Sequence, residues 1–491
     1  MNILLIHPPD ELTRILGRGK AFIQKYEPLG LLSIAACARE KGYPVQVIDA
    51  YAEGIGFKEL KARIASMRPD IVGISTLTCQ GRPVYYLGRW LKRNLPGTLV
   101  VLGNIHASVY ARQYLGQGCC DIVVHGEGEQ VFLEILKSHE KKTDISSIPG
   151  ISFLHGNGEV VTTSGDNTIE DLSLLPFPAR DLVKQELYNL TEISNQTYVG
   201  RKKGVSKTLM TSRGCPYRCT FCAVHRHGRP RYRDAVKVVD EMELLVKQYN
   251  TSYIFIADSL FMSDTERLNK ICSEIRRRKL RVQWGCPTHV NYITPEIIKT
   301  MAAAGCRDLS LGIESGSQRI LDGVRKGISL DRVKQAVDII RRNSKIKTEG
   351  LFILGLPGET LSEAYRTLRL AKSLPLDMAQ FNIFTPYPGS QLFDDLAKKG
   401  ELDTGIRGAA VDPSVWHRFT SYICFTSIQP IWVTPAFTAN RLRHLQKRAL
   451  REFYLRPGQI IRHAGRVRLG NTWKIFGIIM DAFVKRQENF S

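Results

Sequence analysis

The sequence has little negative charge and no long apolar run. Its 69 Lys and Arg residues outnumber 47 Asp and Glu residues, which gives a formal net charge of +22 at pH 7. No apolar stretch reaches the ~18 residues that a membrane-spanning helix needs. The first residues run straight into a strand-like pattern, so we expect no secretory signal. These absences favour a cytoplasmic protein whose clustered cysteines serve a metal or catalysis rather than disulfides.

Three of the eleven cysteines lie in one short stretch. Cys215, Cys219 and Cys222 form a C-x3-C-x2-C array directly after the strand-like run 208–211. Thiolates favour zinc, copper(I) or iron–sulfur clusters, and a closed zinc site usually takes four ligands in paired spacings. Three cysteines on one loop suit a [4Fe–4S] cube with one iron open to an outside ligand, although four-cysteine ligation is the common pattern. A zinc clip is the alternative.

The first 140 residues alternate short apolar runs with amphipathic helical patterns. The candidate strands are 3–6, 45–48, 71–75, 99–102 and 122–124, and the helical patterns between them are 29–41, 57–67, 83–95 and 109–116. This alternation predicts an α/β fold with a doubly wound parallel sheet. Ligands of that fold bind at the carboxyl ends of the strands. The candidate contacts there are His7, Ser75, Thr76, Gly103, His106, Gly126 and Glu127.

Residues 141–205 have the pattern of a linker with a small hairpin, because two apolar runs flank Asn157-Gly158, a strong turn signal. Strand and helix patterns then alternate over residues 206–400, which predicts βα repeats that close toward a barrel. The strands are expected at 253–257, 282–286, 308–312, 348–354 and 378–384.

Residues 401–491 form a basic segment that we expect to be helical. Apolar residues from Trp473 to Val484 recur at helical spacing. The favoured interpretation is a helix packed on the barrel. The second is a basic amphipathic helix on an anionic membrane surface.

Polar residues also follow three of the predicted barrel strands. Asp258 comes after the run 253–257, and an ordinary helix cap is an equally good interpretation of it. Glu314 ends an apolar strand, which is a costly place for a carboxylate without a partner. Gly355 follows the strand at 348–354 in the sequence Gly355-Leu356-Pro357-Gly358-Glu359.

With these motifs in this order, the chain resembles the cobalamin-binding radical S-adenosylmethionine (SAM) enzymes. That family includes cobalamin-dependent radical SAM methyltransferases and anaerobic magnesium-protoporphyrin monomethyl ester cyclases. The resemblance covers nearly the first 400 residues. It implies a Rossmann-like cobalamin-binding domain over 1–140, a partial (β/α)6 barrel over 206–400, and three cofactors: a [4Fe–4S] cluster, SAM and cobalamin.

The resemblance also implies roles for the candidate residues. The three cysteines of the array would hold the cluster, and Phe221, Asp258, Glu314 and Gly355 would contact SAM. The seven strand-end residues of the first domain would contact cobalamin, although a structural role is favoured for His7 and His106 taken singly. The usual D-x-H-x-x-G fingerprint is absent, so no histidine is evident as a lower cobalt ligand. No catalytic acid or base is expected, because a radical abstracts hydrogen without one.

The family chemistry implies reductive cleavage of SAM to a 5′-deoxyadenosyl radical. We expect methylation of an unactivated carbon or phosphorus centre through methylcobalamin. Oxidative ring closure of the magnesium-protoporphyrin cyclase type and a non-catalytic cobalamin sensor are the alternatives. The expected partners are a small-molecule substrate (a lipid, tetrapyrrole or natural-product intermediate) and an external electron donor such as flavodoxin or ferredoxin. Nucleic acid is not expected, because only the net charge favours it.

Overall fold

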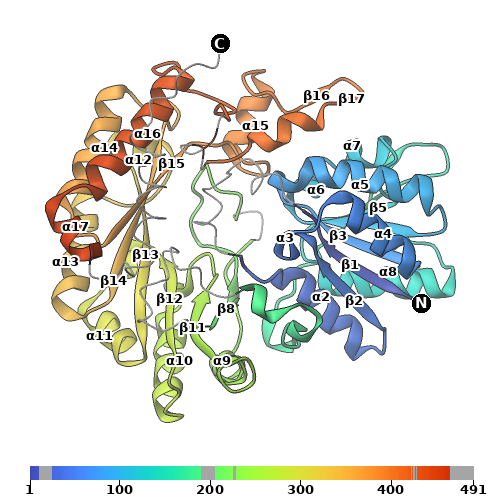
Figure 1. The fold of residues 1–491 in the computed structure, drawn as a ribbon, viewed down its shortest axis with the longest axis horizontal. Coiled ribbons are helices and arrows are strands. Elements are labelled where there is room, and N and C mark those ends of the chain that lie inside the picture. Colours follow the sequence, from blue (N-terminus) through green and yellow to red (C-terminus); the bar gives the residue numbers. More distant parts are fainter. Residues whose placement is uncertain are drawn as a thin grey trace.

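The computed structural model describes residues 1–9, 25–188, 205–224, 228–421, 423, 426 and 428–464, with side chains as far as Ile461. Two large sheets stand side by side, the N-terminal sheet on the right and an open half-barrel on the left of Figure 1. No helix in these ranges is both long and apolar enough to cross a membrane. The stripe expected at 473–484 lies outside the described residues.

The N-terminal sheet has seven strands in the order β2-β1-β3-β4-β5-β6-β7, and β1 to β5 pair in parallel. The strands are β1 (Ile3–His7), β2 (Val45–Asp49), β3 (Ile71–Ser75), β4 (Leu99–Gly103), β5 (Ile122–Val124), β6 (Ile151–Leu154) and β7 (Val160–Thr162). The doubly wound sheet is therefore confirmed. The predicted hairpin, β6 and β7, adds two antiparallel strands to the edge of this sheet.

Helices cover both faces of this sheet, as its nearly continuous apolar strands require. They are α2 (Leu29–Glu40), α3 (Ala50–Glu53), α4 (Phe57–Met67), α5 (Gly81–Asn94), α6 (Ile105–Val109), α7 (Ala111–Gly116) and α8 (Gly128–Lys141). The chain winds both ways from β1, which lies between β2 and β3, so the loops after β1 and β3 open at a topological switch point.

The second sheet has six parallel strands in the order β15-β14-β13-β12-β11-β8. They are β8 (Val205–Leu209), β11 (Thr251–Ile256), β12 (Gln283–Thr288), β13 (Cys306–Glu314), β14 (Lys347–Leu354) and β15 (Met378–Ile383). The predicted partial barrel of six βα units is confirmed.

Helices ring the outside of the half-barrel, and its open side faces the N-terminal domain (Figure 1). These helices are α9 (Ala235–Tyr249), α10 (Thr265–Arg277), α11 (Pro295–Ala303), α12 (Gln318–Gly323), α13 (Leu330–Asn343), α14 (Leu361–Ser373) and α15 (Gln391–Lys398). Their first turns are capped by side chains such as Asp234 on α9 and the Thr360–Glu363 capping box on α14.

The segment after the barrel first crosses to the N-terminal domain. It forms a short hairpin, β16 (Ile406–Arg407) with β17 (Ala410–Val411), and a 3-10 turn that places Trp416 against Tyr110 and Tyr114 with no exposed surface. Only from Ala439 does the segment become helical, in α16 (Ala439–Tyr454), which packs on β15, and α17 (Pro457–Ala464). The described residues between 401 and 437 therefore link the two domains.

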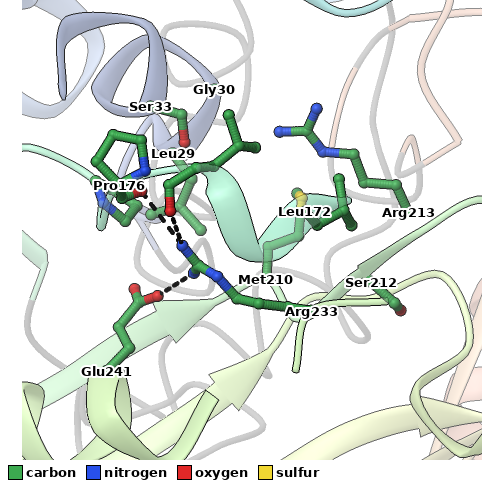
Figure 2. A pocket seen from close by; sticks show the side chains of 12 residues that line it. Leu29, Gly30, Ser33, Leu172, Pro176, Met210, Ser212, Arg213, Arg233 and Glu241 are labelled. Carbon is green, nitrogen blue, oxygen red and sulfur yellow. Dashed lines mark hydrogen bonds and ion pairs between the residues drawn. The ribbon is translucent and has the colours of Figure 1, made fainter. Parts of the chain in front are cut away.

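A buried ion cluster also joins the domains. Arg180 lies between Glu27, which precedes α2, and Glu241 on α9, and all three side chains are 1% exposed. Arg233 binds the other oxygen of Glu241 at 2.6 Å, beside a cavity of about 50 Å³ (Figure 2). Buried charges must pair with opposite charges, so the cluster fixes the position at which the segment that carries Arg180 crosses the barrel.

Arg180→Ala should lower the free energy of unfolding by about 3–5 kcal/mol, because it removes the cation that two buried carboxylates share. Glu241 would keep only Arg233, and Glu27 only Lys207, whose Nζ lies 3.8 Å away. The urea-unfolding midpoint measures this change. The matched control is Arg39→Ala, which removes the exposed ion pair with Asp181 and should cost about 0–1 kcal/mol. Equal costs for the two variants would contradict the assigned role of the cluster.

Candidate functional site

The three-cysteine loop begins where β8 ends, at the carboxyl edge of the barrel. A two-residue strand on each side, β9 (Ser212–Arg213) and β10 (Arg231–Tyr232), closes the base of the loop. Gly214 has φ +85°, and a Cβ there would lie 2.5 Å from the carbonyl oxygen of Arg229, so only glycine fits. Within the loop, Tyr217 stacks on His289 with ring centroids 3.9 Å apart.

A cation that the sequence did not reveal lies beside the cysteines. Lys326, in the turn after α12, donates to Glu314 Oε1 at 2.7 Å, and its Nζ lies 5.9 Å from the ring centroid of Phe221. Burial opposes the ammonium charge, but Glu314 and the thiol groups outweigh it and raise the pKa of Lys326. Burial also raises the pKa of Cys219 to about 11, and Lys326 opposes that shift. The lysine therefore compensates negative charge at this site.

The cysteine set has the chemistry that an iron–sulfur cube needs. Cys219 is buried, and Cys215 and Cys222 are partly buried, all on one loop. Cysteine thiolates are the usual ligands of such clusters. These three cysteines therefore remain the residues that would hold the cluster.

Asp258 lies directly behind this loop. Its carboxylate accepts hydrogen bonds from Thr211 N and Ser212 Oγ, both at 2.6 Å, and only 2% of the residue is exposed. Desolvation raises the pKa of Asp258, while the bonds from Ser212 and Thr211 favour its carboxylate. The structure thus shows Asp258 bracing the segment that leads into the cysteine loop. Its contact with the SAM amino group stays a prediction.

The other predicted SAM residues differ in position. Phe221 and Glu314 lie next to the cysteines, and Glu314 has φ +65°, a conformation that is rare for residues other than glycine. Gly355 is buried: a Cβ there would lie 2.8 Å from Leu442 on α16. Close packing of α16 therefore also requires glycine at this position, and the predicted approach of the Gly355 backbone to adenine stays a prediction.

Two of the predicted cobalamin residues line the open carboxyl edge of the N-terminal sheet. Ser75 accepts a hydrogen bond from Asn104 Nδ2 at 3.1 Å, and a Cβ built on Gly103 would meet no atom within 4 Å. Asn104 is exposed and has φ +77°. This edge therefore offers open backbone, small side chains and an amide, which fit the periphery of a corrin. Asn104, which the sequence reasoning missed, belongs to it.

Two other predicted cobalamin contacts are buried. Thr76 and His106 have no exposed surface, and His106 packs in a cage of Tyr110, Tyr114 and Trp416. Desolvation lowers the pKa of His106 to about 3, so the ring is neutral. This packing agrees with the structural role favoured for His106, and a contact of either residue with cobalamin stays a prediction.

The remaining three predicted contacts face protein groups. His7 bonds Asp49 at 2.9 Å and Gln80 at 2.8 Å, so both ring nitrogens are engaged. Glu127 accepts from Arg231 at 2.6 Å and is 7% exposed, which makes it a link between domains, and its contact with cobalamin stays a prediction. Gly126 has φ +71° and leaves room for Asn167, whose Oδ1 would lie 2.4 Å from a Cβ.

The carboxyl edges of the two domains meet at Gly389, in the loop after β15. A Cβ on this residue would lie 2.7 Å from Ile105 Cδ1 and 3.5 Å from the Cβ of Ala223. Ile105 begins α6 of the N-terminal domain, and Ala223 directly follows the last cysteine of the array. The loop that follows β4, the cysteine loop and the β15 exit loop are thus in direct contact.

Comparisons with known proteins agree with this geometry. Family models for the B12 binding domain and the radical SAM superfamily match residues 20–136 and 209–371. The chain is 31% identical over 469 residues to an uncharacterized methyltransferase of Pyrococcus horikoshii, covering 94% of each chain. It is 31% identical over 413 residues to the anaerobic magnesium-protoporphyrin IX monomethyl ester cyclase of Rubrivivax gelatinosus, covering 82% of this chain and 71% of that one.

A solved structure shares the same fold. It is TsrM, a radical SAM methyltransferase of Kitasatospora setae, with a TM-score of 0.67, 18% identity, and coverage of 96% of this chain and 90% of that one. The chain therefore belongs to the radical SAM superfamily, in the group with an N-terminal cobalamin (B12)-binding domain. The prediction of an enzyme that uses a [4Fe–4S] cluster, SAM and cobalamin is confirmed.

Glu359, which fixes the loop after β14, should make stability depend on pH. Its Oε2 accepts from Gly355 N at 2.6 Å, and burial raises its pKa from 4.5 to about 7. Since the folded state holds this proton more tightly, stability should fall as pH rises from about 4.5 to about 7, by roughly 3 kcal/mol.

Glu359→Gln should remove this contribution. The stability of the variant relative to wild type should therefore increase across that pH range. Urea unfolding at several pH values measures the difference, with exposed Glu401→Gln as the control. A difference that does not change with pH would contradict the assigned burial effect.

Proposed function

We propose that this enzyme transfers a methyl group from SAM to an unactivated carbon or phosphorus centre of a small molecule. The observation that carries the proposal is the contact of Ile105, Ala223 and Gly389, which brings the cobalamin edge and the cysteine loop to one place. A substrate between these edges can be reached from both sides, so positioning is the main task of the fold.

The relatives favour methyl transfer over ring closure. The Pyrococcus horikoshii protein, which aligns over 94% of both chains, is named a methyltransferase. The Rubrivivax gelatinosus cyclase aligns over 71% of its own length, so part of that enzyme has no counterpart in the alignment. Methyl transfer is therefore favoured over ring closure of the cyclase type.

Different residues of this chain would hold the cluster and bind SAM. Cys215, Cys219 and Cys222 would hold the cluster, and Glu314 with Lys326 would bind polar groups of SAM next to it. When bound, the cofactors supply the electron, the radical and the methyl carrier. The protein itself orients the substrate and excludes water. Because each cleavage of SAM consumes one electron, an external donor such as flavodoxin or ferredoxin belongs to the proposal.

The test uses SAM with a deuterated methyl group. Anaerobic incubation of the reconstituted full-length enzyme with reductant and cell extract should give a product that carries the labelled methyl, detected by mass spectrometry. An oxidised product without added label would contradict methyl transfer and favour ring closure. Absence of SAM cleavage in every condition would contradict catalysis itself.

Cysteine variants control this experiment. Cys219→Ala should abolish both the visible absorbance of the cluster and the cleavage of SAM, because one of three iron ligands is lost. The matched control is Cys272→Ala, which removes a fully buried thiol on α10 far along the chain from the array. It should retain both properties.

The contact between the two edges predicts a variant that uncouples the reaction. Ile105→Arg should place a charge against Gly389 and push the edges apart, while every cysteine stays in place. Methyl transfer should fall about 100-fold, since small misplacements cost that much, and SAM cleavage should stay within about two-fold of wild type.

Both rates come from one mass-spectrometric assay that quantifies labelled product and 5′-deoxyadenosine. The control is Leu154→Arg, at an exposed apolar position on β6 of the same sheet. Parallel loss of both activities in the Ile105 variant would contradict the assigned meeting of the edges.

A further inference from the structure

The end of the half-barrel opposite the cysteines is strongly basic. In a parallel sheet, each connecting helix returns to the amino ends of the strands, so the last turns of α10 and α13 and the loops after them gather there. We call this end the basal face. Its exposed cations include Arg276, Lys279, Arg281, Arg307, Arg341 and Lys345.

Four of these cations surround a hollow of about 730 Å³ between β11, β12 and β13. Arg276, Lys279, Arg281 and Arg307 line it, and none of them forms an ion pair with an acid in the described part of the chain. Cations at a helix end can complement the helix dipole. At the end of α10, Arg277 and Arg278 pair with Glu274, whereas Arg276 in the same last turn has no acidic partner in the described residues. The charge around the hollow is therefore left for an outside anion.

A short helix with exposed apolar side chains lies on the same face. Leu455, just before α17, is 51% exposed, and Ile460 and Ile461 within it are 50% and 76% exposed. The helix is fixed at the amino end of β15, because buried Gln459 donates to Leu376 O at 2.8 Å and Arg456 donates to Lys372 O. These two anchors hold α17 so that its two isoleucines are not covered by any described part of the chain.

We infer that the basal face docks on an anionic lipid surface, with α17 inserting its isoleucines and the cations around the hollow binding headgroups. Exposed apolar side chains and cations on one face are the combination that such interfaces use. A polyanion such as RNA would use the cations but not the isoleucines. A second copy of the chain carries the same +22 charge and would be repelled.

The inference does not rest on methyl transfer. In this orientation the edge that carries the cysteines faces away from the lipid, since it lies at the opposite end of the strands. The site would remain open to a substrate and an electron donor while the enzyme is bound.

Vesicle flotation of the purified full-length protein tests the inference without an activity measurement. The protein should float with phosphatidylcholine–phosphatidylglycerol vesicles, should not float with pure phosphatidylcholine, and should dissociate at high salt. Arg276→Glu/Arg281→Glu should weaken binding at least about tenfold, since each cation near an anionic surface contributes about fivefold. Ile460→Ser/Ile461→Ser should also weaken it, at every salt concentration.

Matched controls change similar side chains elsewhere. Arg93→Glu reverses an exposed cation on α5, and Leu174→Ser removes an apolar side chain that is 78% exposed. Both should bind vesicles as wild type does, and circular dichroism checks the fold of each variant. No flotation with anionic vesicles at low salt, or wild-type flotation of both double variants, would overturn the inference. So would RNA binding without vesicle binding, or a dimer that the isoleucine variant dissociates.

Discussion

Salt bridges between the start of α8 and the base of the cysteine loop determine how the two cofactor domains face each other. Glu127 and Glu129 bind Arg213, which lies two positions before the first cysteine of the array. Glu127 also binds Arg231 on β10. Desolvation disfavours the Glu127 carboxylate, but the two arginines outweigh it and lower its pKa. Buried pairs of this kind are costly when one partner is missing, so only one docking of the domains satisfies all of them.

This constraint decides which side chains are free for ligands. Among the polar side chains at the carboxyl edges, His7, Glu127 and Asp258 are occupied by protein partners. What remains open is backbone and small side chains at Ser75 and Gly103, together with the cysteine loop. The charged pair Glu314 and Lys326 also lies beside that loop. Most other charged side chains named at these edges therefore fix loops in place.

The local pattern of apolar and polar residues was enough to predict the two sheets of the fold. The five N-terminal strands were located to within one residue, because each is an apolar run between a helix and a polar loop. The cysteine array was found from spacing alone. Residues whose roles depend on partners distant in the sequence were not predicted. Trp416 packs on His106, which lies 310 positions earlier in the chain. Lys326 lies next to the cysteine array, although more than 100 residues separate it from Cys222. No periodicity or spacing encodes such contacts.

In this enzyme the direction of the parallel strands places the cofactor site at one end of the half-barrel and the basal face at the other. Strand carboxyl ends from both domains converge at Gly389, whereas helix carboxyl ends collect on the basal face. The segment that includes Trp416 then spans the junction and belongs to neither sheet. Because the frame fixes the cofactors, the outcome of the reaction is left to the groups that lie between the edges. Relatives named for methyl transfer and for ring closure both align with most of this chain.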